Sequence, residues 1–142
     1  MAGVDHLDLV VSDLERSLAF YRDLLGPLGY TRTSEIEGER GERVVYIGTE
    51  RGEQASVSLR ERQSRERETP YDRYDLGIHH LAFGVSSREE VDERAAWARG
   101  QGAEIESGPE EYDYTEGYYA VFLHDPDGLK LELVHRPGGP CC

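Results

Sequence analysis

The stretch IHHLAFGVSS, at residues 78–87, repeats the character of DHLDLVVSD near the start of the chain. Each is a short apolar run that begins close to a histidine and leads into the start of a predicted helix. His6 and His80 lie 74 positions apart, and the same offset takes Ser58 to Glu132. The sequence therefore predicts one module written twice, with a histidine at the head of each copy and a carboxylate at the tail of the second.

The composition limits the class of protein. The chain has 142 residues, which suits one compact domain or two small modules that share a core. Its 29 acidic residues outnumber 16 basic ones, and the net charge of −13 disfavours binding to nucleic acid or to an anionic membrane. No segment approaches the roughly 20 apolar residues that cross a bilayer, so we expect a soluble, cytoplasmic protein. Cys141 and Cys142 end a Pro-Gly tail, and no disulfide framework is expected.

The first module is predicted to be βαβββ. Residues 4–11 alternate as a strand, and Ser12 with Glu15 resembles a capping box for a helix that stops at Gly26. Three further strands are predicted at residues 28–37, 43–49 and 54–60.

The second module follows the same order. A strand at 78–85 leads to a helix capped by Ser86 or Ser87, with Val91, Ala95 and Ala98 on its buried face. A short strand at 103–107, a loop at 109–116, and strands at 118–124 and 129–135 joined by a turn at 125–128 complete it. The predicted fold class is α+β, a single domain with modules at 4–60 and 78–135 joined by a charged linker at 61–77.

Alternation along the predicted strands places candidate metal ligands on the faces that lack a helix. In residues 129–135 the leucines share one face and Glu132 lies on the other. The same test puts His6 and His80 opposite the apolar residues of their strands. If an approximate twofold relates the two modules, these faces meet in one cup.

Two imidazoles and one carboxylate form a ligand set for divalent iron, manganese, cobalt, nickel or zinc. Three protein ligands leave positions open for water or substrate, which favours catalysis, with Glu132 or a bound water helping to move a proton. A single strand histidine is often only a hydrogen-bonded residue, so it is the paired placement that favours a metal. His79 is expected to pack on the leucine-facing side, and His124 and His135 are expected at the surface.

At three places the sequence resembles the vicinal oxygen chelate superfamily, which contains glyoxalase I, extradiol dioxygenases, methylmalonyl-CoA epimerase, fosfomycin-modifying enzymes and bleomycin-resistance proteins. The matching segments are VDHLDLV at 4–10, GIHHLAF at 77–83 and the tail at 118–135. The resemblance implies paired βαβββ modules that form an eight-stranded cup, and one divalent metal held by His6, His80 and Glu132 as a Lewis acid. It also implies a small-molecule substrate and a homodimer.

The resemblance leaves several functions open. Glyoxalase I and the epimerase generally take a fourth ligand where this chain has Ser58, a poor metal ligand, which puts a strict glyoxalase I activity in doubt. We favour a metal-dependent glyoxalase-like enzyme of lyase or isomerase type that acts on a small oxygenated metabolite. The alternatives are an extradiol-type dioxygenase, a fosfomycin-type thiol transferase and a non-catalytic drug-binding protein of the bleomycin-resistance kind.

The expected lining of the cup favours a partly apolar substrate over a small anion. If even-numbered positions of the strand at 118–124 face inward, Ala120 and Phe122 supply no cationic group. The candidate substrate contacts are Tyr46, Ser58, Arg60, Tyr118, Tyr119 and Phe122.

Overall fold

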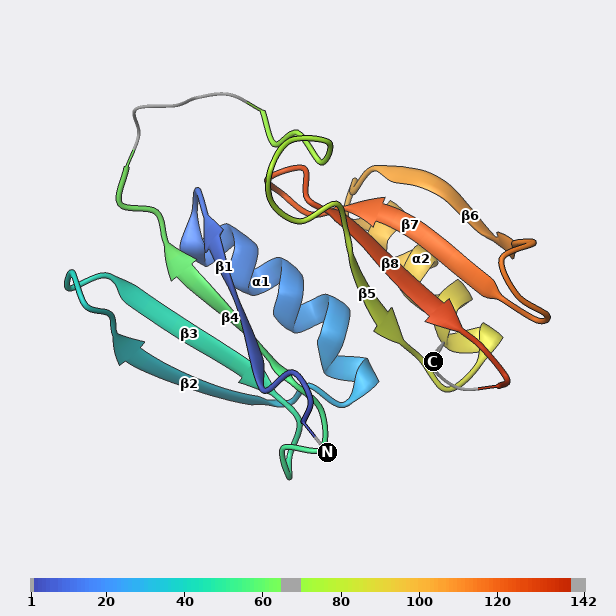
Figure 1. Ribbon diagram of the computed structural model, residues 1–142, viewed down its shortest axis with the longest axis horizontal. Coiled ribbons are helices and arrows are strands. Elements are labelled where there is room, and N and C mark those ends of the chain that lie inside the picture. Colours follow the sequence, from blue (N-terminus) through green and yellow to red (C-terminus); the bar gives the residue numbers. More distant parts are fainter. Residues whose placement is uncertain (1, 65–69, 139–142) are drawn as a thin grey trace. The chain divides into compact units, whose positions relative to one another are not determined.

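The computed structural model describes residues 2–64 and 70–138, and it divides the chain into two compact units, residues 1–69 and 70–142 (Figure 1). Each unit contains one four-stranded sheet and one α-helix. The predicted α+β class with two βαβββ modules is confirmed. Part of the predicted linker, residues 65–69, lies outside the described residues, as do Cys141 and Cys142.

The strands of the two units are connected in the same way. Unit 1 contains β1 (His6–Val11), α1 (Leu14–Leu25), the short 3-10 helix η1 (Gly26–Leu28), β2 (Arg32–Glu37), β3 (Arg43–Gly48) and β4 (Ser56–Glu61). Unit 2 contains β5 (Leu81–Gly84), α2 (Arg88–Gly100), β6 (Ile105–Glu111), β7 (Tyr119–His124) and β8 (Lys130–His135). The sheet orders are β1-β4-β3-β2 and β5-β8-β7-β6, and in each the first pair is parallel and the others antiparallel.

The register of strand pairing supports the internal repeat. Asp8 pairs with Ser58 across β1 and β4, and Ala82 pairs with Glu132 across β5 and β8. Both members of the second pair lie 74 positions after those of the first, so the two sheets share one register. Position 58 in unit 1 is therefore the structural equivalent of position 132 in unit 2.

Each helix covers one face of the sheet in its own unit. In unit 1, α1 packs on β4 and buries Tyr21, Leu24 and Leu25 completely. In unit 2, α2 packs on β6, β7 and β8, and its predicted buried face of Val91, Ala95 and Ala98 is confirmed. Among the described residues, no helix has the length and apolar character needed to cross a bilayer.

The helix starts agree with the sequence in one unit and differ in the other. Ser87 caps α2, because its hydroxyl accepts a hydrogen bond from the Glu90 backbone N–H at 3.2 Å. At α1 the prediction of Ser12 is wrong, since Asp13 accepts from the Arg16 N–H at 3.0 Å. Asp13 is one residue closer to the first turn, where a carboxylate also stabilises the positive end of the helix.

The strand β6 is longer than predicted, so the expected loop at 109–116 is wrong in its first part. Gly108 has a φ of +81°, and a Cβ there would lie 2.4 Å from the Ala120 carbonyl oxygen. The register with β7 shifts between Ser107 and Glu110. This irregularity lets the strand continue through Pro109, which is tolerated because β6 is an edge strand.

A small ion cluster ties the edge of the unit 2 sheet to the preceding loop. Glu106 accepts two hydrogen bonds from the Arg73 guanidinium, at 2.7 and 3.0 Å, and its second oxygen lies 3.1 Å from Lys130 Nζ. These contacts, led by the Arg73 hydrogen bonds, lower the pKa of Glu106 to about 2. The side chain is 28% exposed, so solvent weakens the cluster only in part.

We expect Glu106→Gln to lower the free energy of unfolding by about 1 to 2 kcal/mol at pH 7. Because the folded-state pKa of Glu106 is depressed, its contribution is present above the unfolded value of 4.5 and is lost as the pH falls toward 2. Urea unfolding at pH 7 and pH 3 measures the difference. Glu111→Gln is the control, since its pair with Arg88 is 56% exposed on the carboxylate side. If Glu106→Gln lowers the free energy of unfolding by as much at pH 3 as at pH 7, the depressed pKa of Glu106 is not the source of the effect.

Candidate functional site

The carboxylate of Glu132 is the buried acid of unit 2. It projects from β8 on the face opposite Leu131 and Leu133, and the residue is 2% exposed. A buried carboxylate is costly unless it is hydrogen-bonded. Here the Tyr118 hydroxyl donates to Glu132 Oε1, and His80 Nε2 lies 3.2 Å from Oε2. Both oxygens therefore have a partner, and one of the partners is a predicted metal ligand.

His80 lies immediately before β5, and each of its two ring nitrogens has a polar neighbour. Its Nδ1 lies 2.8 Å from Nδ1 of His79, so one of these nitrogens donates to the other. Partial desolvation, followed by the charge of His80, lowers the pKa of His79, which favours a neutral ring that can accept. If His80 donates from Nδ1, its Nε2 carries a lone pair beside Glu132. The expectation that His79 packs on the leucine-facing side is wrong, because β5 begins only at Leu81 and His79 is exposed.

The spacing of His80 and Glu132 suits a shared ion. Metal bonds of about 2.1 Å at angles between octahedral and tetrahedral place two ligand atoms roughly 3.0 to 3.4 Å apart. The Nε2 to Oε2 distance of 3.2 Å falls in this range. This pair therefore fits a divalent metal, and it equally forms a hydrogen bond when the ring donates from Nε2.

His6, at the start of β1, repeats the arrangement of His80. Its Nδ1 lies 2.8 Å from the Asp5 carboxylate, which raises the pKa of His6. Asp5 and His79 are equivalent positions of the repeat, so in each unit the residue before the histidine engages Nδ1. A partner at Nδ1 fixes the ring orientation and leaves Nε2 available for a ligand. Taken separately, neither unit gathers three His, Cys, Asp or Glu side chains into a metal group among its described residues.

Aromatic side chains surround the unit 2 pair. Phe122, Ala120 and Val134 form a buried cluster, and Tyr112 and Tyr118 pack against it. Burial, together with the hydrogen bond to Glu132, raises the pKa of Tyr118 and keeps its hydroxyl protonated. The helix-free face of this sheet therefore has an apolar centre beside polar groups: Glu132 and His80 on one side, and Lys130, whose Nζ lies 4.4 Å from the centre of the Phe122 ring.

In unit 1 the carboxylate stands on the neighbouring strand. Ser58, the equivalent of Glu132, is fully buried, and its hydroxyl donates to Asp8 on β1. Arg60 also binds Asp8, at 2.8 Å, and forms a second ion pair with the buried Glu42. The two carboxylates raise the pKa of Arg60 and keep it charged. The polar groups of Ser58 and Arg60 are thus engaged inside the protein, a network that the sequence analysis did not foresee.

Tyr119 does not share a face with Glu132. Its hydroxyl donates to Asp92 of α2 at 2.7 Å, and the Arg88 guanidinium lies 4.9 Å from the centre of its ring. It therefore belongs to the helix side of the unit 2 sheet. We leave it out of the proposed site for this reason, whereas Tyr118 and Phe122 lie on the Glu132 side.

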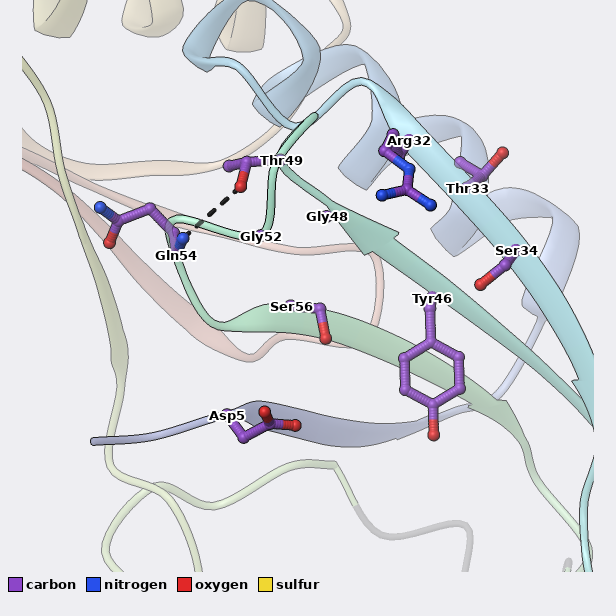
Figure 2. A pocket seen from close by; sticks show the side chains of 10 residues that line it. All are labelled: Asp5, Arg32, Thr33, Ser34, Tyr46, Gly48, Thr49, Gly52, Gln54 and Ser56. Atoms are coloured by element: carbon purple, nitrogen blue, oxygen red, sulfur yellow. Dashed lines mark hydrogen bonds between the residues drawn. The ribbon is translucent and has the colours of Figure 1, made fainter. Parts of the chain in front are cut away.

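A pocket of about 280 Å³ opens on the helix-free face of unit 1 (Figure 2). Tyr46, a predicted substrate contact, lines it, and the Tyr46 ring meets the His6 ring edge-on with centroids 5.9 Å apart. The other polar side chains of the lining include Arg32, Ser34, Ser56 and Asp5. The sequence did not point to Arg32, because every residue of β2 is exposed and the strand has no apolar face from which to assign its side chains.

A family model for the Glyoxalase/Bleomycin resistance protein/Dioxygenase superfamily matches residues 3–133. The chain belongs to this superfamily. Its resemblance to vicinal oxygen chelate proteins is confirmed by this match and by the duplicated βαβββ architecture.

Relatives and solved structures agree with this assignment. The chain is 35% identical to a lactoylglutathione lyase from Haemophilus influenzae over 137 residues, which cover 92% of this chain and 90% of that one. A putative glyoxalase from Bacillus halodurans is similar in structure, with a TM-score of 0.71, 28% identity, and coverage of 94% and 95%. FosX from Listeria monocytogenes, with a TM-score of 0.62, 22% identity, and coverage of 94% and 90%, has been crystallised with manganese and a dihydroxypropylphosphonic acid. Members of the superfamily therefore include divalent-metal proteins.

We expect Tyr118→Phe to weaken metal binding by about 10- to 100-fold, because it removes the hydrogen bond that orients the Glu132 carboxylate. Calorimetric titration with manganese, nickel and zinc measures the affinity. Tyr114→Phe is the control, since this residue is 64% exposed and the variant keeps the ring that packs against Tyr112 and Tyr118, removing only a hydroxyl. Wild-type affinity in Tyr118→Phe would show that the hydroxyl does not orient a ligand.

Proposed function

We propose that this protein is a metal-dependent glyoxalase-like enzyme, of lyase or isomerase type, that acts on a small oxygenated metabolite. The proposed ligands of one divalent iron, manganese, nickel, cobalt or zinc ion are His6, His80 and Glu132. The observation that carries the proposal is the His80–Glu132 pair, whose facing atoms lie 3.2 Å apart while Tyr118 holds the remaining oxygen of the acid. The lactoylglutathione lyase named among the relatives supports the lyase type.

The chain's own residues would supply orientation, proton transfer and exclusion of water. When bound, the metal supplies a Lewis acid that stabilises negative charge on a substrate oxygen. Tyr118 orients the Glu132 carboxylate through Oε1, and Oε2 faces His80 Nε2 at 3.2 Å, so Glu132 would take a proton only as one of these two contacts opens. The buried cluster of Ala120, Phe122 and Val134 would give Glu132 apolar surroundings, which strengthen its polar contacts.

Ser58 separates this protein from the four-ligand pattern of the family. Its hydroxyl donates a hydrogen bond to the Asp8 carboxylate, and Arg60 also binds this carboxylate. We therefore propose a three-ligand site with open coordination positions, and we propose a substrate other than lactoylglutathione. The predictions of a homodimer and of a cytoplasmic location stay predictions.

Metal content provides the first test. We expect about one divalent ion per chain after loading, and a rise in melting temperature, because an ion that binds only the folded state stabilises it. His80→Ala and Glu132→Gln should lose the ion while circular dichroism stays unchanged. His124→Ala is the matched control, as this histidine lies beside Glu104 and Glu106 instead. A His80→Ala variant with full metal content would show that the ligand assignment is wrong.

Activity assays separate the remaining functions. We expect metal-dependent turnover within a panel of small 2-oxo and 2-hydroxy compounds, and little turnover of lactoylglutathione. A yellow product after anaerobic iron loading and exposure to catechol and air would instead identify an extradiol dioxygenase. Tight binding of a drug in the presence of chelator, without turnover of any compound, would favour sequestration.

A further inference from the structure

The pocket of unit 1 is built around a row of residues that crosses the sheet. Arg32 on β2 pairs with Gly48 on β3, and His6 on β1 pairs with Ser56 on β4. Gly48 and Ser56 are neighbours, since a Cβ on Gly48 would lie 3.6 Å from the Ser56 Cβ. Residues in such a row face the same side, so Arg32 and His6 lie at the two ends of one line, roughly 14 Å apart at the backbone.

The absence of a side chain on Gly48 leaves the middle of this row hollow. In Figure 2 the Arg32 side chain extends from β2 toward Gly48, while the Tyr46 ring and the Ser56 hydroxyl extend from β3 and β4 toward β1 and Asp5. One Arg32 N–H group donates to the Glu50 carbonyl oxygen at 3.2 Å, which orients the guanidinium. Within the described residues the other N–H groups of this guanidinium have no hydrogen-bond partner.

The charge of Arg32 is not matched by a carboxylate, unlike those of the other arginines on this sheet. Arg43 binds Glu35 and Glu15, and Arg60 binds Asp8 and Glu42. Within residues 2–64, Arg32 forms no such ion pair. A guanidinium that is oriented by a carbonyl group and unpaired in a pocket is a site for an anion, because its planar fork matches a carboxylate or a phosphonate.

We propose that this pocket binds the carboxylate of a small organic acid, with Arg32 as the residue that recognises the anionic group. The hydroxyls of Ser34, Tyr46 and Ser56 offer further hydrogen bonds to it. A monoanion is favoured over a dianion, since the lining contains one guanidinium and the Asp5 carboxylate at the His6 end. This proposal departs from the earlier expectation that a partly apolar substrate is favoured over a small anion, because the Arg32 guanidinium in the lining was not foreseen. The oxygenated carbon of the acid would point toward His6.

This inference deepens the proposed function, and it rests on that function only for the role of His6. Binding in the presence of chelator therefore tests the pocket without the metal. The probes are lactate, its uncharged amide lactamide, and methylphosphonate, each titrated into nitrogen-15-labelled protein and followed by amide chemical shifts. We expect lactate to shift the amides of Arg32, Ser34 and Gly48, and lactamide to bind at least about tenfold more weakly.

Two variants sharpen the test. Arg32→Gln should weaken lactate binding at least about tenfold, whereas Arg40→Gln, an exposed arginine outside the pocket, should leave it unchanged. Gly48→Val should abolish binding by filling the hollow, and it should fold because its Cβ meets Ser56 at an ordinary contact distance. Tighter binding of methylphosphonate than of lactate would overturn the choice of a carboxylate.

Other outcomes would overturn the proposal as a whole. Equal binding of lactate and lactamide, an unchanged affinity in Arg32→Gln, or no amide shift with millimolar lactate would each do so. The two proposals fail separately. If the protein binds lactate but takes up no metal, the anion pocket is supported and the proposed metal-dependent enzyme is contradicted. If it takes up metal but does not bind lactate, the metal site is supported and the anion pocket is contradicted.

Discussion

The burial of the Glu132 carboxylate is the constraint on which the proposed chemistry of unit 2 depends. A charged group with 2% exposure is stable only where partners surround it, and here Tyr118 and His80 supply them. The strand β8 meets this constraint by placing the acid between two leucines that face the other way. The same alternation thus fills the core under α2 and directs the acid toward the site.

The two units place a carboxylate on the helix-free face of the sheet with residues on different strands. The register is the same, but unit 2 places its acid on β8 opposite Ala82, while unit 1 places its acid on β1 opposite Ser58. The unit 1 acid is bound by Arg60, which also holds the buried Glu42. Duplication therefore preserved the backbone, whereas the polar groups on the helix-free face diverged toward an internal network in one copy and a candidate ligand pair in the other.

Much of the fold was predictable because it follows from the two-residue alternation of the strands and from the offset between the two copies of the repeat. The 74-residue offset located the repeat, and alternation in β8 separated Glu132 from the leucines. Features that depend on particular contacts were not predictable. Gly108 extends β6 past Pro109 through a close approach to the Ala120 carbonyl, and this contact has no signature in the local sequence pattern.

The candidate site was predictable to a similar extent. The face of Glu132 followed from alternation in β8, whereas His80 lies before β5, so its contact with Glu132 could not be read from strand alternation. The Arg32 side chain could not be assigned to a pocket because the hollow depends on Gly48, which lies on a different strand. The hydrogen bond of Tyr119 to Asp92 likewise depends on where α2 crosses the sheet.

The unequal partners of the two histidines have a consequence for charge balance. His6 is backed by an anion, Asp5, whereas His80 is backed by the neutral ring of His79. A cation beside His6 would therefore meet a ring whose far side already carries a negative charge. A cation beside His80 would meet a ring with a neutral neighbour, and it would depend on Glu132 for its charge balance.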